Sequence, residues 1–123
     1  MKAASLILSL ILAFAGAISD QLAGKWSGNW TPKEGTPDAI TVELKEDRPG
    51  KLAGQFLTPV RMPFTNATFD PKTRTVLLEA VDEKSGKHYR VDGKVQGNDL
   101  KGTLAAGEVK GDLLLIKWTF MPH

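Results

Sequence analysis

The sequence predicts one all-β domain, an antiparallel, eight-stranded, up-and-down meander barrel, preceded by an N-terminal signal helix. Two observations predict the sheet. Apolar and polar residues alternate through most of the chain after residue 17, which is typical of half-buried strands. Turn-forming residues (Pro, Gly, Asn and Asp) recur at intervals close to the roughly 8–12 residues of a meandering sheet. A third observation, the different character of the first 17 residues, predicts the signal helix.

The N-terminal segment has the three parts of a secretory signal peptide. Lys2 provides a positive charge, residues 6–14 are almost all apolar, and Ala15, Gly16 and Ala17 are small, as signal peptidase requires. The apolar run is shorter than the roughly 20 residues that span a membrane. We therefore expect cleavage after Ala17, a secreted or periplasmic protein, and no stable membrane insertion afterwards. An uncleaved anchor is the alternative.

Composition limits the partners and the chemistry. The expected organisation is a signal peptide (1–17), a short tail (18–22) and a single barrel domain (23–121). Sixteen Lys and Arg are interspersed with fourteen Asp and Glu, so the basic stripe that nucleic-acid binding needs is missing and we expect no nucleic-acid partner. With no Cys, and with His88 and His123 as the two histidines, the sequence shows no metal-ligand spacing, and we expect no cofactor.

Each predicted strand is an alternating or apolar run that ends at a turn signal. In order, the strands cover residues 23–31, 40–45, 52–56, 60–69, 75–81, 88–96, 100–104 and 108–120. Between them, the Asp70 side chain is expected to bond the backbone two residues on. Gly86 is expected in the left-handed conformation of a hairpin loop. Gly97 and Asn98 predict a tight hairpin.

The last predicted strand changes phase. Gly111 and Leu113 are in step with its start, whereas Ile116, Trp118 and Phe120 fall on the opposite parity. A β-bulge near Gly111 or Leu113 would bring both sets to the core side. We therefore expect a bulge there, with Trp118 pointing inward.

Closure into a barrel follows from the short strands, which would leave exposed edges in an open sheet. Eight consecutive antiparallel strands satisfy the barrel geometry, and a two-sheet sandwich is the alternative. Mid-strand glycines such as Gly28 and Gly102 favour the barrel, because sharply coiled strands bring other groups close to the backbone.

The run Gly24-Lys25-Trp26, at the start of the first strand, resembles the G-x-W signature of the calycins, the group of lipocalins and avidins. Residues 52–56 resemble the third strand of avidins. The resemblance implies a lipocalin-like barrel in which Trp26 plugs one end and a cationic side chain stacks over it. Lys117, on the last strand, is expected to be that cation.

The resemblance does not extend to biotin binding. The position of the avidin Asn, two residues after the signature Trp, is Gly28 in this chain, and the third-strand Tyr is replaced by Phe56. The polar groups that bind the ureido group of biotin are therefore missing.

No catalytic constellation of nucleophile, base and orienting group stands out, and we expect a protein that is not an enzyme. Ser27 is expected to face solvent, Ser85 lies in a predicted hairpin, and His88 lies on the polar face of its strand beside Arg90. Asp92 and Asp112 are the closest approach to a carboxylate pair, as neighbours across the closing strands.

Two functions stay open. In the first, the barrel binds a small apolar or amphipathic ligand at its open end, where Arg61 would pair with an anionic group of the ligand. The residues expected at this end are Trp30, Phe56, Met62, Tyr89 and Arg61. In the second, side chains fill the barrel, which acts as a protein-interaction or structural module of the cell envelope with an unknown partner. An interior cavity of about 300 Å³ or more would favour the first.

Overall fold

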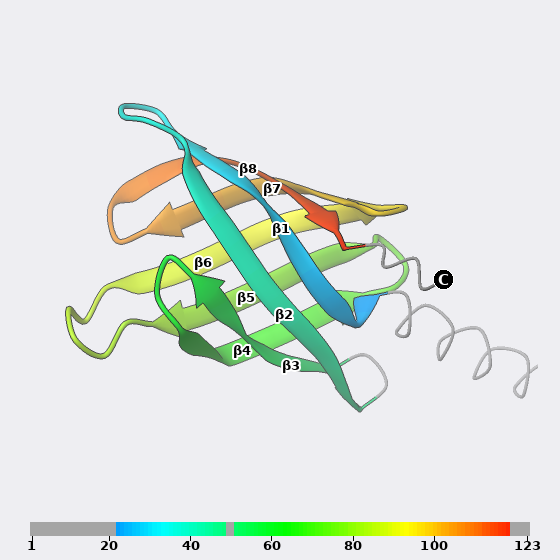
Figure 1. Cartoon of the computed structure of the whole chain (residues 1–123). Helices are drawn as coiled ribbons and strands as arrows, with labels where there is room; N and C mark the ends of the chain where they lie inside the picture. The colour runs from blue at the N-terminus through cyan, green and yellow to red at the C-terminus, as the bar shows by residue number, and fades with distance from the viewer. Residues whose placement is uncertain (1–21, 49–50, 119–123) are drawn as a thin grey trace, which may run out of the picture.

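In a computed structural model that describes residues 22–48 and 51–118, eight antiparallel strands form one closed barrel (Figure 1). Each strand pairs with its neighbours in sequence, and β1 pairs with β8 to close the ring. This confirms the predicted barrel and excludes the sandwich. The predicted signal helix lies outside the described residues.

The strands match the predicted runs closely. They are β1 (Gly24–Pro32), β2 (Asp38–Arg48), β3 (Lys51–Thr58), β4 (Met62–Asp70), β5 (Thr75–Val81), β6 (His88–Gln96), β7 (Asp99–Ala106) and β8 (Val109–Lys117). The connections β1–β2, β3–β4, β5–β6 and β7–β8 lie at one end of the barrel, which we call the Trp30 end. The opposite end, where β1 begins, is the Trp26 end.

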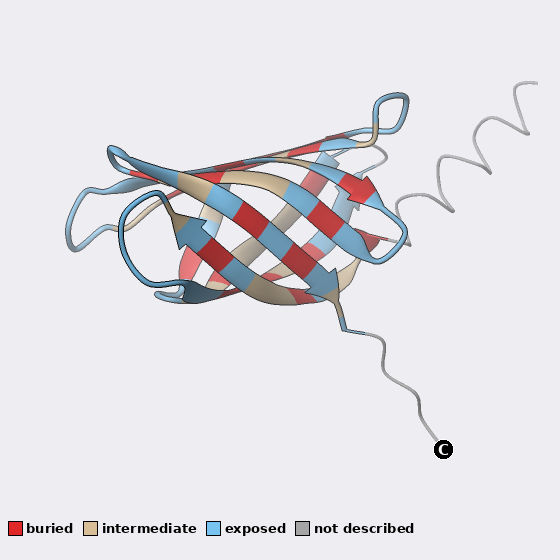
Figure 2. Cartoon of the chain, turned by 90° about the horizontal axis from the view of Figure 1, so that it is seen from above, coloured by how far each residue is buried: buried red, intermediate tan, exposed pale blue. Residues whose placement is uncertain are grey.

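Alternate residues of every strand point into the barrel, and Figure 2 shows the resulting alternation of buried and exposed positions. On β5, for example, Val76, Leu78 and Ala80 are buried, whereas Thr75 is exposed. All eight strands contribute buried apolar residues to a single core. Each fully buried Leu, Val or Phe side chain stabilises the fold by roughly 1.5–3 kcal/mol, so the interior holds the strands together without disulfides.

The predicted turns form by the expected mechanisms. The Lys72 backbone N–H donates to the Asp70 carboxylate at 2.9 Å. Gly86 and Gly97 have φ angles of 75° and 61°, in the left-handed region that glycine adopts without strain.

Close backbone approaches explain the mid-strand glycines. A β-carbon on Gly28 would overlap the Leu114 carbonyl oxygen on β8, and one on Gly102 would overlap the Asp92 carbonyl oxygen on β6. Strong coiling of the strands around a narrow barrel therefore requires glycine at these two positions.

The predicted bulge in the last strand is wrong. The β7–β8 register runs without a shift from Asp99↔Ile116 to Ala106↔Val109, and the β1–β8 register is equally regular. Both ladders hold β8 in step, so Leu113 and Leu115 point inward and Ile116 points outward. A bulge would interrupt both ladders, while regular pairing already supplies two leucines to the core. Trp118, expected to point inward, is instead 54 % exposed, and Phe120 lies outside the described residues.

The two ends of the described chain lie side by side at the Trp26 end. The Trp118 backbone N–H donates to the Lys25 carbonyl oxygen at 2.9 Å, and Lys117 is opposite Trp26 in the β1–β8 register.

Candidate functional site

Trp26 lies buried inside the barrel, toward the end where β1 begins. Its side chain is 0 % exposed, and its indole N–H donates to the Leu22 carbonyl oxygen at 2.9 Å. Leu22, which the sequence analysis places in the N-terminal tail, is itself buried against the core. The segment just before β1 therefore folds over the indole and belongs to the barrel.

Lys117 lies where the predicted stacking cation would be, opposite Trp26 and on the inward parity of β8. Its side chain is half-buried, and its Cε would lie 3.4 Å from a β-carbon on Gly24. A lysine–tryptophan stack is also present on the outside of the barrel, where Lys25 Nζ lies 5.2 Å from the ring centre of Trp118. The role of Lys117 over Trp26 stays a prediction.

At the Trp30 end, the structure brings most of the predicted ligand-binding residues together as a packed aromatic group. Phe56 lies 5.8 Å from Tyr89 and 5.3 Å from Phe64, measured between ring centres, and it is opposite Met62 in the β3–β4 register. Phe56 and Met62 are fully buried. Arg61 is exposed in the β3–β4 connection.

Trp30 joins the same end of the core and has its polar atom satisfied within the protein. The side chain is 8 % exposed, and its indole N–H donates to the Leu104 carbonyl oxygen on β7 at 3.0 Å. No buried side-chain nitrogen or oxygen of the described residues lacks a hydrogen-bond partner. The interior therefore offers no unpaired polar group to orient a ligand.

Tyr89 is the titratable side chain of this aromatic group. Burial raises the pKa of its hydroxyl above the ordinary value of 10.0, and the negative charges of Asp82 and Asp38 raise it further. Both carboxylates stand at the rim of the Trp30 end, Asp38 at the start of β2 and Asp82 just after β5. Two carboxylates at this rim therefore act on the Tyr89 hydroxyl.

Two surface grooves lie outside the barrel wall. The first, of about 850 Å³, separates the β1–β2 connection from the β7–β8 hairpin, and Lys33 and Glu34 face Glu108 and Lys110 across it. The second, of about 460 Å³, follows the outer faces of β1, β7 and β8 and includes Asn29, Lys101 and Leu114. Thr31 and Asp112 line both grooves, which are therefore adjacent.

The outer face of β8 continues from the grooves into an exposed apolar row, the β8 stripe, formed by Leu114, Ile116 and Trp118. Their exposed fractions are 40 %, 51 % and 54 %. The Trp118 indole N–H donates to the Ser27 hydroxyl oxygen on β1 at 2.6 Å. Two outward positions of β8, and Trp118 directly after the strand, thus expose large apolar side chains.

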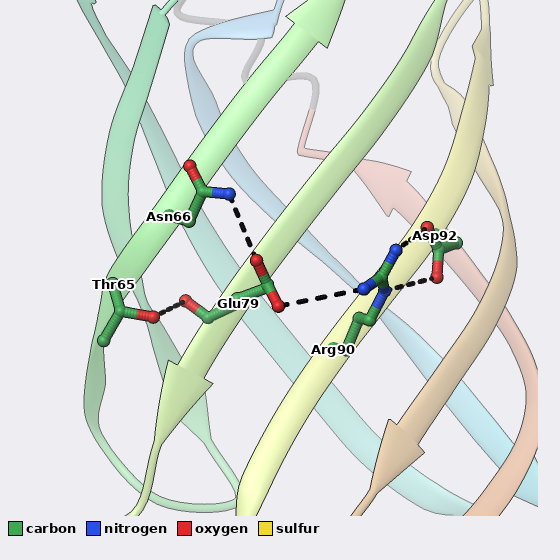
Figure 3. Close-up of polar contacts among 5 residues, drawn as sticks. All are labelled: Thr65, Asn66, Glu79, Arg90 and Asp92. Carbon is green, nitrogen blue, oxygen red and sulfur yellow. Dashed lines mark hydrogen bonds and ion pairs between the residues drawn. The ribbon is translucent and has the colours of Figure 1, made fainter.

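The outer face of β4, β5 and β6 contrasts with this stripe, because it carries a group of polar side chains that contact one another (Figure 3). Glu79 accepts a hydrogen bond from Asn66 at 3.1 Å and lies 3.9 Å from Arg90, and Arg90 also pairs with Asp92 at 3.0 Å. Such exposed pairs contribute about 0–1 kcal/mol each. These polar contacts are largely exposed to solvent.

Groups with the potential for catalysis lie apart. Asp92 and Asp112 are each opposite Thr103, on either side of β7, so they are not direct neighbours. His88 is exposed at the start of β6. Within residues 22–48 and 51–118, no group of three or more His, Cys, Asp or Glu side chains is placed to hold a metal ion. In that same part of the chain, no helix is both long and apolar enough to cross a membrane.

Sequence reasoning missed the β8 stripe. Leu114, Ile116 and Trp118 share one parity, and the structure places them opposite the inward Leu113 and Leu115. The expected β-bulge, which would bring both parities to the core side, led to the wrong placement of Ile116 and Trp118. No family model matches the chain, and no curated protein matches it either.

Proposed function

We propose that this protein is an exported, non-enzymatic barrel with a filled interior, and that it acts as an interaction module through the outer face of β8. The observation that carries the proposal is the β8 stripe. Large apolar side chains gathered on one exposed strand, beside a groove, are characteristic of protein interaction sites.

The filled interior supports this function over ligand storage in the barrel. A ligand-sized cavity would give the surrounding side chains accessible surface, yet Trp26, Phe56 and Met62 are at most 2 % exposed. The two grooves of 850 and 460 Å³ lie outside the wall. The sequence leaves two functions open, ligand binding inside the barrel and interaction through its outer surface. The packing of the interior favours the second.

Burial of the stripe would provide a modest driving force. Each of the three side chains exposes roughly half of its surface, and covering that half contributes about 1 kcal/mol per residue. A contact through this face is therefore reversible unless the groove adds further interactions.

Site-specific photo-crosslinking in the producing cells tests the proposal. A photoreactive residue at Ile116 is expected to give a discrete crosslinked product. The same residue at Val60, which is equally apolar, 40 % exposed and located in the β3–β4 connection, is expected to give none. Equal labelling from both positions, or none from either, would refute the interaction surface.

A further inference from the structure

Charge is distributed unevenly along the barrel axis. The half toward the Trp26 end, which we call the basic half, contains nine Lys and Arg and four Asp and Glu among the described residues. It therefore has an excess of five positive charges, whereas the rest of the described chain has an excess of three negative charges. The basic half comprises residues 22–27, 44–48, 51–54, 67–77, 93–102 and 114–118.

The positive side chains surround this end of the barrel and do not follow one line. They come from six strands (β1, β2, β3, β6, β7 and β8) and from the β4–β5 connection, and seven of the nine are exposed. Figure 1 shows the start of β1, the end of β8 and the β4–β5 and β6–β7 connections at this one end. A ring of charge fits a flat anionic surface, whereas a linear polyanion requires a basic stripe.

Two pairs of like charges lie directly opposite each other within the basic half. Lys94 is opposite Lys101 in the β6–β7 register, and Arg48 is opposite Lys51 in the β2–β3 register. All four side chains are exposed. Like charges in directly opposite positions destabilise a sheet. Anions outside the chain would reduce this repulsion, so both pairs favour a negatively charged partner.

Neighbouring carboxylates do not pair with the two lysines of β6 and β7. Asp92, two residues from Lys94 on the same strand, is paired with Arg90 at 3.0 Å. Asp99 is two residues from Lys101, yet neither lysine forms an ion pair with another residue of 22–48 or 51–118. Their positive charges are therefore available at the surface.

Exposed apolar side chains accompany the charge at the same end. Lys101 is opposite Leu114, where the β8 stripe begins, and Trp118 directly follows the end of β8. Lys25 Nζ lies 5.2 Å from the ring centre of Trp118. Tryptophan is enriched at membrane–water interfaces, where its ring lies at the level of the headgroups. Lysine combines an apolar stem with a charged end that suits the same depth.

We propose that the basic half docks on a bilayer that contains anionic phospholipid, with Trp118 in the headgroup region. Charge complementarity carries the proposal, because each Lys or Arg close to an anionic leaflet strengthens binding. Such docking is peripheral and reversible, in agreement with the expected lack of stable membrane insertion. The inference goes beyond the interaction module, since most of this surface lies outside the β8 stripe.

Flotation of the protein produced from the full chain with lipid vesicles tests the proposal. Wild type is expected to float with vesicles of phosphatidylcholine and phosphatidylglycerol in equal parts, and not with phosphatidylcholine alone. Raising the salt from about 0.1 M to about 1 M is expected to release it, because the Debye length falls from about 10 Å to about 3 Å. A wild type that does not bind the anionic vesicles at the lower salt concentration would overturn the proposal.

A double variant locates the binding surface. Lys94→Ala with Lys101→Ala is expected to weaken vesicle binding by roughly tenfold or more, because each cation contributes about a factor of five. The matched control is Lys84→Ala with Lys87→Ala, which removes two exposed lysines of the β5–β6 connection at the Trp30 end. It has the same net charge and is expected to bind like wild type. Equal weakening in both double variants would overturn the basic half as the docking surface.

Lys101→Glu separates vesicle binding from folding. It replaces the like-charge pair with an opposite-charge pair to Lys94, so the midpoint of urea denaturation is expected to be at least that of wild type. Vesicle binding is expected to fall in the same variant. Binding equal to that of wild type would show that the lysine pair does not face the bilayer.

Tryptophan fluorescence reports the orientation. Trp26 and Trp30 are buried, whereas Trp118 is 54 % exposed, so a change in emission on adding anionic vesicles reports on Trp118. A shift to shorter wavelength is expected. Flotation with the vesicles but no shift would overturn the proposed orientation.

The remaining outcomes separate this inference from the interaction module. A protein crosslinked to Ile116 in cells, without any vesicle binding, would overturn the membrane and leave the module. Vesicle binding without a crosslinked protein would support the membrane and overturn the module. Binding to heparin but not to vesicles would assign the basic half to a linear polyanion and overturn the proposed bilayer.

Discussion

Tyr89 lies between the aromatic group and the carboxylates of Asp82 and Asp38, and its ionisation reports on both. It is the single tyrosine of the chain, so tyrosinate absorbance follows it alone. Burial, then Asp82, then Asp38 raise its pKa above 10.0. The folded state thus holds this proton more tightly than the unfolded state does. Its contribution to stability is complete below pH 10.0 and is lost as the pH rises through the folded pKa.

An alkaline titration checks this expectation. Wild type is expected to ionise above pH 10.0, and Asp82→Asn is expected to ionise at a lower pH, because one of the charges that raise the pKa is gone. Asp99→Asn, at the opposite end of the barrel, serves as the control and is expected to titrate like wild type. A midpoint at or below 10.0 in wild type would show that the hydroxyl is solvated and that the Trp30 end is open.

Gly28 tests the close approach of β1 and β8. The added methyl group of Gly28→Ala would overlap the Leu114 carbonyl oxygen, and overpacking of this kind typically costs about 1–3 kcal/mol. In Gly86→Ala, by contrast, the new methyl group meets nothing within 4 Å, and the cost is about 1 kcal/mol for the left-handed backbone. Denaturant unfolding of both variants compares the two. An equal loss of unfolding free energy in the two variants would mean that β1 and β8 move apart at Gly28 with little strain.

At the scale of the strand, the adjacent residues Leu115 and Ile116 test the direction of β8. Leu115 is 0 % exposed, so Leu115→Ala is expected to lower the free energy of unfolding by about 2–5 kcal/mol. Ile116 points outward, and Ile116→Ala is expected to cost less than about 1 kcal/mol. Urea denaturation measures both. A larger loss of unfolding free energy for Ile116→Ala than for Leu115→Ala would support the predicted bulge after all.

The strands could be predicted because each local pattern agrees with its neighbours. Alternation in β5 and β6 and the turns at Asp70 and Gly97 indicate the same hairpins that the structure shows. The direction of the second half of β8 could not be predicted in this way. Both parities are apolar there, so the pattern alone does not indicate which set faces the core, and the decision comes from the two neighbouring strands.

The candidate site was harder to predict for a related reason. The sequence correctly grouped Phe56, Met62 and Tyr89 at one end of the barrel, because inward parity and strand order determine that placement. Whether those side chains leave space between them depends on packing across the barrel, which alternation does not describe. The bond from Trp30 to the Leu104 carbonyl oxygen, between residues 74 positions apart, is an example.

For the whole molecule, a filled interior predicts a large penalty for truncation at its centre. Phe56→Ala is expected to cost about 3–5 kcal/mol, because the ring contacts of Tyr89 and Phe64 are lost and a void remains. Native mass spectrometry of the wild type is expected to show the bare chain. A bound mass that leaves on denaturation, and that Trp30→Ala abolishes, would instead establish the ligand-binding barrel.

The adjacent ends of the described chain have a consequence for connectivity. Leu22 and Trp118 lie at the same end of the barrel, and β1 is hydrogen-bonded to β8. The sheet is therefore continuous between the first and the last strand, although no peptide bond joins them. A circular permutant that links these ends through a few residues and opens the exposed β5–β6 loop would keep every strand pairing. Its new termini would emerge at the Trp30 end, opposite the end where Leu22 and Trp118 lie. The position of the chain ends therefore decides which end of the barrel a fusion partner is attached to. Fusions to the two forms would present opposite ends of the barrel outward.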